Sequence, residues 1–284
     1  MALLRWALLS LGVILVAVAL VGAAVVFKDQ QAAQASSAAM PVGTAAPEPG
    51  EFREIKRTDF RIRQLSTYEF SPSEATRQLA SKHAAWRGPN RRVWYEVSPK
   101  RIGPSTPLVI LLHGAGRDGL SLIEIWKDVA AREGIALLAL DSIGSSWRLE
   151  DADPAFLVSL VDKMVAHHGI DPARIYLFGH SSGAFYAQYL LNRVDGPWAA
   201  AALHAGYAPS NALQRPATPK PYRLYLGAEG HIFSVETARA LGRGLAEVGH
   251  DNELVIIPRH THWLYQVGPQ IAADAWDWLD SRPR

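Results

Sequence analysis

The chain has 284 residues, of which 49% are hydrophobic, and its 29 Lys and Arg stand against 27 Asp and Glu, a formal net charge of +2. A chain of this length can bury one large core, so one catalytic domain is expected. The balanced charge gives no electrostatic case for nucleic-acid binding, and the sequence has no Cys, which excludes disulfides, thiolate metal sites and cysteine nucleophiles.

The N-terminal segment predicts a transmembrane anchor over residues 1–27. After Arg5, residues 6–27 carry no charged side chain. A spanning helix needs about 20 apolar residues, whereas the apolar region of a cleaved signal peptide takes about 7 to 15. We therefore expect a single pass through the cytoplasmic membrane, with the rest of the chain outside the cytoplasm, in the periplasm if the source is bacterial. The tripeptide Ala33-Gln34-Ala35 leaves secretion after signal cleavage as the alternative.

The next residues predict a linker and the start of a folded domain. Residues 28–50 are mostly Ala, Gln, Ser, Pro and Gly, which bury too little apolar surface to order the chain, so we expect a flexible tether there. The folded domain is predicted over residues 51–284. Within it, the apolar spacing over 71–86 predicts a helix, and the alternation over 92–97 predicts a strand.

The remainder alternates strands with helices. Buried apolar runs predict strands over 107–112, 135–140, 174–178, 199–203, 222–226 and 254–257. Amphipathic spacing predicts helices over 121–133, 153–168, 184–193, 235–248 and 270–281. This order predicts an α/β fold with a mostly parallel central sheet and helices on both faces, in which ligands bind at the carboxyl ends of the strands.

The most informative motif is Gly179-His180-Ser181-Ser182-Gly183. It follows a predicted strand and precedes a predicted helix, which is the context of a nucleophile elbow, a sharp turn that presents its serine above the sheet. We expect Ser181 to be a nucleophile. A serine hydroxyl needs a base to take its proton, and an imidazole is the usual one. His260 and His262, just after the last predicted strand, are both candidates.

Two further segments resemble a known family. Asp171-Pro172-Ala173-Arg174-Ile175-Tyr176 leading into the elbow, and residues 252–265, are similar to the polyhydroxybutyrate-depolymerase and esterase D-like members of the α/β-hydrolase superfamily. The resemblance runs from about residue 107 to the C-terminus, and it implies an α/β-hydrolase fold. In that group the last histidine commonly precedes an aromatic residue. Because Trp263 follows His262, the resemblance favours His262 as the base and leaves His260 as the alternative.

The α/β-hydrolase layout also implies donors for the negative charge that forms on the attacked carbonyl oxygen. One is the amide after the nucleophile, here that of Ser182. The other comes from the loop after an earlier strand, here His113-Gly114-Ala115-Gly116, and is expected from Ala115 or Gly116.

This sequence departs from the family at the position of the acid that orients the catalytic histidine. The similar esterases usually read Gly-x-x-Asp after the strand that ends here near Gly227, and this chain has Gly230 at the aspartate position. Glu229 lies one residue earlier and is our predicted acid. Asp141, directly after the strand over 135–140, is the alternative.

These residues predict a serine esterase that forms an acyl-enzyme. Its substrate is expected to be a small-molecule or polymeric ester, with the membrane as a further partner through the N-terminal helix. Peptidase or acyltransferase chemistry would use the same machinery. The missing aspartate leaves open a hydrolase fold that has lost activity and binds an envelope component instead. No cofactor and no metal are predicted, since the histidines lack a metal-ligand spacing, and no motif here specifies an oligomeric state.

Overall fold

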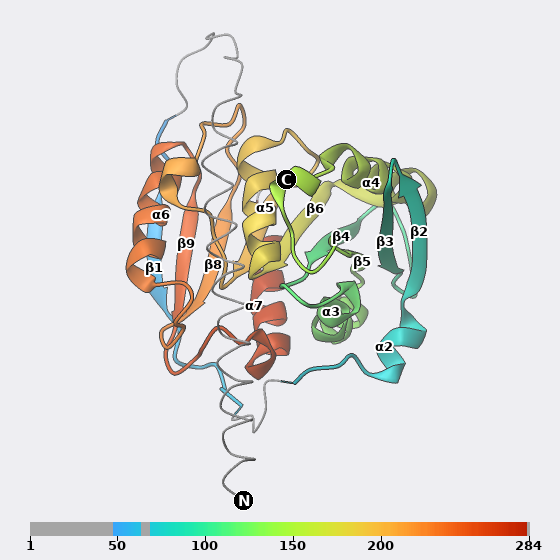
Figure 1. Ribbon diagram of the computed structural model, residues 1–284, viewed down its shortest axis with the longest axis horizontal. Helices are drawn as coiled ribbons and strands as arrows, with labels where there is room; N and C mark the ends of the chain where they lie inside the picture. Colours follow the sequence, from blue (N-terminus) through green and yellow to red (C-terminus); the bar gives the residue numbers. More distant parts are fainter. Residues whose placement is uncertain (1–47, 64–68, 283–284) are drawn as a thin grey trace, which may run out of the picture. The chain divides into compact units, whose positions relative to one another are not determined.

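A computed structural model of the chain describes residues 48–63 and 69–282. Its centre is a nine-stranded sheet in the order β1-β9-β8-β7-β6-β4-β5-β3-β2 (Figure 1). From β1 to β5 every neighbouring pair is parallel, and β3 and β2 add antiparallel strands at one edge. The strands are β1 Phe52–Lys56, β2 Ser81–Arg87, β3 Asn90–Val97, β4 Thr106–Leu112, β5 Ala136–Leu140, β6 Ile170–His180, β7 Ala200–His204, β8 Tyr222–Gly227 and β9 Asn252–Ile257.

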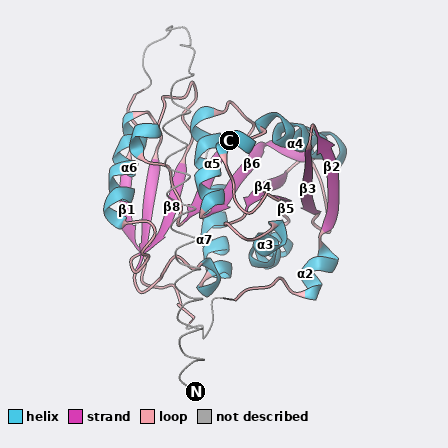
Figure 2. Ribbon diagram, in the orientation of Figure 1, coloured by secondary structure: helices cyan, strands magenta, loops and turns pink. Residues whose placement is uncertain are grey.

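Helices α2 to α6 lie between strands along the chain and α7 follows the last strand. Figure 2 shows the helices in cyan and the strands of the sheet in magenta. Side-chain caps set where several of them begin: Asp118 accepts a hydrogen bond from the Ser121 N–H at the start of α3, and Asp153 accepts one from the Phe156 N–H at the start of α4. α3 ends at Gly134, which adopts the left-handed conformation that a C-terminal glycine permits. The helices are α2 Glu74–Leu79, α3 Gly119–Glu133, α4 Pro154–His168, α5 Ser182–Arg193, α6 Val235–Glu247 and α7 Gly268–Asp280.

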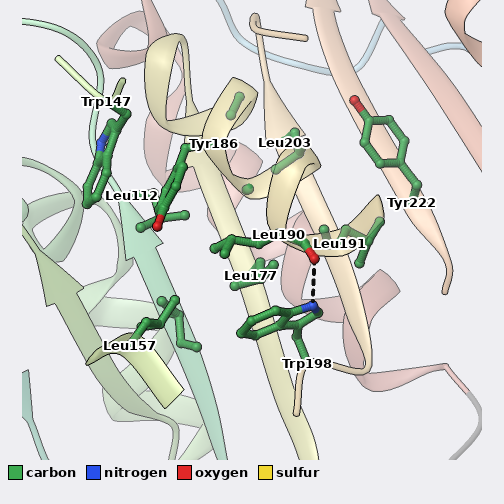
Figure 3. Packing of buried hydrophobic residues seen from close by; sticks show 14 of the residues in the cluster. Leu112, Trp147, Leu157, Leu177, Tyr186, Leu190, Leu191, Trp198, Leu203 and Tyr222 are labelled. Carbon is green, nitrogen blue, oxygen red and sulfur yellow. Dashed lines mark hydrogen bonds between the residues drawn. The ribbon is translucent and has the colours of Figure 1, made fainter. Parts of the chain in front are cut away.

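The sheet separates two hydrophobic layers. Residues of α4, α5 and α6 pack on one face, and residues of α3 and α7 pack on the other. Every residue of β4 is buried, as expected for a parallel strand covered on both faces. In the first layer the indole of Trp198 is fully buried, and its N–H donates to the Leu190 carbonyl oxygen at 3.2 Å (Figure 3). This satisfied donor lets a large aromatic side chain fill the core without an unpaired polar atom.

The predicted α/β architecture with a mostly parallel sheet is confirmed, but the leading region differs from the prediction. The helix predicted over 71–86 is limited to α2, and residues 81–87 instead form β2, which pairs with β3. Gly88, at φ 58°, allows the chain to reverse between the two strands. The hydrogen bonds to β3 therefore decide the conformation of a segment whose apolar spacing favoured a helix. β1, which pairs with β9, was not predicted.

The predicted anchor over 1–27 and most of the predicted linker over 28–50 lie outside the described residues. Within residues 48–63 and 69–282, none of the helices combines the length and the apolar character that crossing a membrane requires.

Candidate active site

The elbow serine has an unusual backbone conformation. Ser181 lies between the last residue of β6 and the first residue of α5, at φ 54° and ψ −119°. A non-glycine residue at positive φ is uncommon and costs on the order of 1–3 kcal/mol, so the surrounding structure must hold it in place. One such contact is the Ser181 N–H, which donates to the His204 carbonyl oxygen at the end of β7, at 2.9 Å.

Glycines make this conformation possible because the backbone segments around Ser181 pack too closely to leave room for side chains. A Cβ atom at Gly179 would overlap the carbonyl of Gly183, and one at Gly183 would overlap the carbonyl of Leu112 at the end of β4. A Cβ at Gly206 would overlap the carbonyl of Ser181 itself. The two motif glycines and Gly206 therefore fix how closely the elbow approaches β4 and the segment after β7.

Ser181 and His262 are hydrogen-bonded to each other. The distance from Ser181 Oγ to His262 Nε2 is 3.0 Å. His262 belongs to the loop after β9, where Arg259 at φ 60° turns the chain back toward the elbow. Of the two histidines predicted as the base, His262 is the one beside the serine. The geometry is that of a nucleophile with an adjacent base.

Aromatic rings surround the His262 imidazole. The ring centroid of Phe233 lies 5.8 Å away at an interplanar angle of 21°, and that of His180 lies 5.2 Å away at 38°. Burial against such groups disfavours the imidazolium and lowers the pKa of His262 to about 4. The ring is therefore neutral at pH 7, which is the form that can accept the serine proton.

The predicted acid, Glu229, does not contact His262. After β8 the chain forms a tight turn in which the Gly230 N–H donates to the Gly227 carbonyl oxygen at 3.1 Å. The Glu229 N–H donates to the His260 carbonyl oxygen at 2.9 Å, while its side chain is exposed. Among the described residues, no carboxylate pairs with the imidazole of His262.

The alternative acid, Asp141, is hydrogen-bonded to the start of α3 instead of to His262. It follows β5, which lies two strands from β6 on the side away from β9. Its Oδ1 atom accepts a hydrogen bond from the Gly119 N–H at the start of α3, at 2.8 Å. Burial raises the pKa of Asp141 to about 6. Both acids proposed from the sequence are thus separated from the imidazole, because the turn after β8 directs one outward and the sheet order moves the other away.

Two of the three predicted oxyanion donors are free to act. The loop donor is expected from Ala115 or Gly116, and of these two the N–H of Gly116 is engaged with the Ser145 carbonyl oxygen at 2.6 Å. Within residues 48–63 and 69–282, the N–H groups of Ala115 and of Ser182, the first residue of α5, donate to no acceptor. Free amides at a helix start and in a neighbouring loop are the arrangement that binds an oxyanion.

The loop that carries Ala115 is anchored next to the elbow. His113 Nε2 accepts a hydrogen bond from the Ser142 N–H at 3.0 Å, and the His113 carbonyl oxygen accepts one from the Trp147 indole at 2.9 Å. A Cβ atom at Gly114 would lie 3.4 Å from the Ser181 Cβ. The same Cβ would overlap the His180 Cδ2 atom at 2.8 Å, so the absence of a side chain at Gly114 lets the loop pack against the residue that precedes Ser181.

Three buried histidines that sequence reasoning assigned no structural role lie beneath the elbow. His204 is bonded through Nδ1 to His180 Nδ1 at 2.9 Å and through Nε2 to His260 Nε2 at 2.8 Å. His180 ends β6, His204 ends β7 and His260 follows β9. In the sequence, a histidine stands at or just after the end of each of three predicted strands. Because the carboxyl ends of parallel strands meet at one edge of a sheet, this pattern could have indicated the cluster. The contacts are pairwise, and within the described parts of the chain no three potential ligands gather around a possible metal site.

The hydrogen-bond network assigns one proton to each of these rings. His180 Nδ1 also faces the His204 carbonyl oxygen at 3.3 Å, so it carries the proton and His204 Nδ1 accepts. His204 then donates through Nε2 to His260. Burial lowers the pKa of all three rings, that of His260 to about 4. Protonating His204 or His260 would bring two N–H donors face to face.

These buried rings predict that the fold loses stability in mild acid. A histidine whose pKa is lowered in the folded state stabilises the protein fully above its unfolded pKa of about 6.5, and that contribution falls as pH drops toward the folded pKa. From pH 6.5 to 5, one such ring costs up to about 2 kcal/mol of unfolding free energy. Urea denaturation at pH values between 7.5 and 5 measures this slope.

The same substitution at a buried and at an exposed histidine provides the matched comparison. His204→Gln removes a ring from the cluster and should flatten the pH dependence of the unfolding free energy. His167→Gln makes the same change at an exposed position on α4 and should leave the wild-type slope intact. Equal slopes in the wild type and the His204 variant would show that the cluster does not carry the effect.

This chain is similar to known proteins both in sequence and in structure. A family model described as esterase PHB depolymerase matches residues 99–215. A bifunctional acetylxylan esterase/xylanase of Neocallimastix patriciarum is 28% identical over 114 residues, which are 38% of this chain and 17% of that protein. The chain therefore spans less than a fifth of the length of that relative.

Solved structures share the fold. A thermostable esterase superposes with a TM-score of 0.58 at 20% identity, covering 74% of this chain and 64% of that one. Esterase 2 of Thermogutta terrifontis gives a TM-score of 0.58 at 16% identity, covering 73% of this chain and 92% of that one. The chain therefore has the α/β-hydrolase fold, and it resembles the esterases of the PHB depolymerase family.

Proposed function

We propose that this protein is a serine hydrolase that cleaves carboxylic esters through an acyl-enzyme intermediate. The observation that carries the proposal is the 3.0 Å hydrogen bond between Ser181 Oγ and His262 Nε2, at an elbow flanked by the free amides of Ala115 and Ser182. The likeness to esterases over residues 99–215 supports an ester as the substrate, either a small molecule or a polymer.

In the proposed reaction, Ser181 Oγ attacks the ester carbonyl carbon while His262 Nε2 takes the hydroxyl proton. The carbonyl oxygen becomes an oxyanion that accepts hydrogen bonds from the amides of Ser182 and Ala115. The intermediate collapses, the bond to the alcohol breaks, and His262 returns the proton to the leaving alkoxide. A water molecule, deprotonated by the same imidazole, then hydrolyses the acyl-serine and frees the acid.

In this proposal a Ser–His dyad carries out the chemistry, and none of the described carboxylates stabilises the imidazolium. In serine proteases, replacing the triad aspartate by an uncharged residue lowers turnover by about 10⁴-fold. Contacts with Phe233 and His180 hold the ring in place but supply no negative charge. We therefore infer slow turnover, with a base that stays deprotonated down to about pH 4.

A fluorophosphonate probe tests the nucleophile. The wild-type protein should form a stable covalent adduct, Ser181→Ala should form none, and His262→Gln should slow labelling by about 10²- to 10⁴-fold because general base catalysis is lost. Ser159→Ala, the same change on helix α4, is the control and should label at the wild-type rate. Mass spectrometry of the intact protein measures the adduct.

Because no described carboxylate contacts His262, we expect that introducing one at position 230 increases activity. A Cβ atom at Gly230 would lie 3.2 Å from the Gly227 carbonyl oxygen and 3.7 Å from the His262 backbone nitrogen, so Gly230→Asp fits after a small adjustment. An acid there should raise kcat for an aryl ester by about 10-fold or more by stabilising the imidazolium. It should also move the acidic limb of the pH–rate profile upward from about pH 4, because a nearby negative charge raises the pKa of a histidine.

The uncharged isostere Gly230→Asn is the control for that substitution. It occupies the same space without the charge, so it should produce neither the higher kcat nor the shifted pH limb. Equal rates for the Asp and Asn variants would rule out this loop as the place of a triad acid.

The absent carboxylate also supports a second candidate, a hydrolase-fold protein that binds an envelope component without turnover. Failure of the wild-type protein to react with fluorophosphonates and to hydrolyse short aryl esters would favour it. Peptidase and acyltransferase activities use the same serine and base, and amide and alcohol acceptors in the same assay distinguish them.

We also propose that residues 1–27 anchor the protein in the cytoplasmic membrane with residues 51–284 outside the cytoplasm. The support is the uncharged run over residues 6–27, which is long enough to span a bilayer. The full chain should stay in the membrane pellet after an alkaline carbonate wash, and a chain that starts at residue 48 should not. A released protein whose N-terminus follows Ala35 would instead establish secretion after cleavage.

A further inference from the structure

Arg117 lies directly after the loop that carries the proposed oxyanion donor. Its backbone N–H donates to the Gly114 carbonyl oxygen at 3.2 Å and closes the turn of that loop. Asp118, the next residue, is the N-cap of α3. The loop next to the elbow and the first turn of α3 therefore hold the Arg117 backbone on both sides.

The side chain of Arg117 is enclosed by aromatic rings. Its guanidinium carbon lies 6.0 Å from the ring centroid of Phe70, 5.1 Å from that of Trp263 and 5.6 Å from that of Tyr265. Among the residues that the structure describes, one hydrogen bond holds it, from Nη1 to the Phe70 carbonyl oxygen at 2.9 Å. These contacts stabilise a cation at a half-buried position.

No carboxylate of the described residues pairs with this cation. The neighbouring Asp118 accepts a hydrogen bond from the Ser121 N–H at 3.1 Å instead, and no ion pair forms within 4.0 Å of the guanidinium. Other partly buried arginines among the described residues, such as Arg223 and Arg57, do form ion pairs with acids. Arg117 thus carries a positive charge for which the described residues supply no ion-pair partner.

The donors of Arg117 remain available for a ligand. A guanidinium has five N–H donors in one plane, and ring contacts over its faces leave the edges of that plane accessible. Acceptors in the described part of the chain use one donor, and none of the others is a buried, unsatisfied atom. The free edge matches a carboxylate, which accepts two parallel hydrogen bonds from a guanidinium.

Aromatic contacts connect the cation to the residues next to the catalytic dyad proposed above. Trp263 directly follows His262, and Tyr265 contacts the ring of His180 at 6.4 Å, the residue before Ser181. The charge of Arg117 contributes to lowering the pKa of the buried His180. The same short segments therefore place the nucleophile, its base and this cation at one edge of the sheet.

We propose that Arg117 binds a carboxylate on the substrate, so that the preferred substrates are esters that also carry a free carboxylate group. This inference rests on the proposed function, since it assigns the substrate class of the same site. The ester carbonyl lies at Ser181 and the amides of Ser182 and Ala115, while the substrate carboxylate pairs with the guanidinium.

Two aryl esters with equal chain lengths test the proposal. Mono-4-nitrophenyl adipate ends in a carboxylate, and 4-nitrophenyl hexanoate ends in a methyl group, while the leaving group and the number of acyl carbons are the same. For the full chain, kcat/KM for the adipate relative to the hexanoate should fall by about 10- to 100-fold in Arg117→Gln, the effect expected for losing a hydrogen-bonded charge. Arg117→Lys should retain part of this ratio, because it keeps the charge without the planar fork.

Arg91→Gln is the matched control, because it removes one positive charge at an exposed position of β3 and should keep the wild-type ratio. An equal loss for both esters in Arg117→Gln would assign Arg117 a purely structural role and overturn the proposal. An unchanged ratio would overturn it as well.

A binding measurement separates this inference from the proposed function. Isothermal titration of mono-methyl adipate into Ser181→Ala protein, with and without Arg117→Gln, measures the cation without any turnover. Binding that weakens about 10-fold or more in the double variant supports the carboxylate site even if the wild-type protein hydrolyses neither ester. Equal affinities, or no binding to either protein, would refute the site even if both esters are hydrolysed.

Discussion

The close approach of backbone to backbone around Ser181 is the constraint on which the site depends. Gly183 packs against the end of β4 and Gly206 packs against Ser181 itself, at distances that exclude any side chain. The Ser181 N–H is fixed by the carbonyl of His204. Three parallel strands thus hold one residue at a positive φ that its own preferences oppose. The stability of the sheet maintains this strained geometry, and the strain presents the hydroxyl above it.

The histidines around this elbow are neutral, and the charged group near it is a cation. Beneath it lie His180, His204 and His260, whose hydrogen bonds require neutral rings. The proposed base, His262, is likewise neutral because it is buried among aromatic groups. The charge that the described residues do bring to the site is the cation of Arg117, held over three rings without an acid. The environment therefore suits an anionic ligand better than a cationic one, since a substrate carboxylate meets the Arg117 cation.

The two residues considered as the triad acid show why a carboxylate at a strand end is insufficient evidence. Glu229 and Asp141 both follow strands of the sheet, as a catalytic acid would. The turn after β8 exposes the side chain of Glu229, while Asp141 accepts a hydrogen bond from the start of α3. A carboxylate acts on an imidazole only if it lies within hydrogen-bonding distance of it, and loop conformation determines whether it does.

The sequence alone predicted the alternation of strands and helices, because buried apolar runs and amphipathic spacing are local patterns. A motif located the elbow, and chain order limited the base to His260 or His262; the resemblance to the esterases favoured His262, which the structure places beside Ser181. The sequence could not reveal the histidine cluster, the aromatic contacts of Arg117 or the engagement of the Gly116 amide by Ser145. Each of these joins residues from separate strands or loops. Their distances depend on strand order and on loop conformation, so they exist only once the sheet has formed.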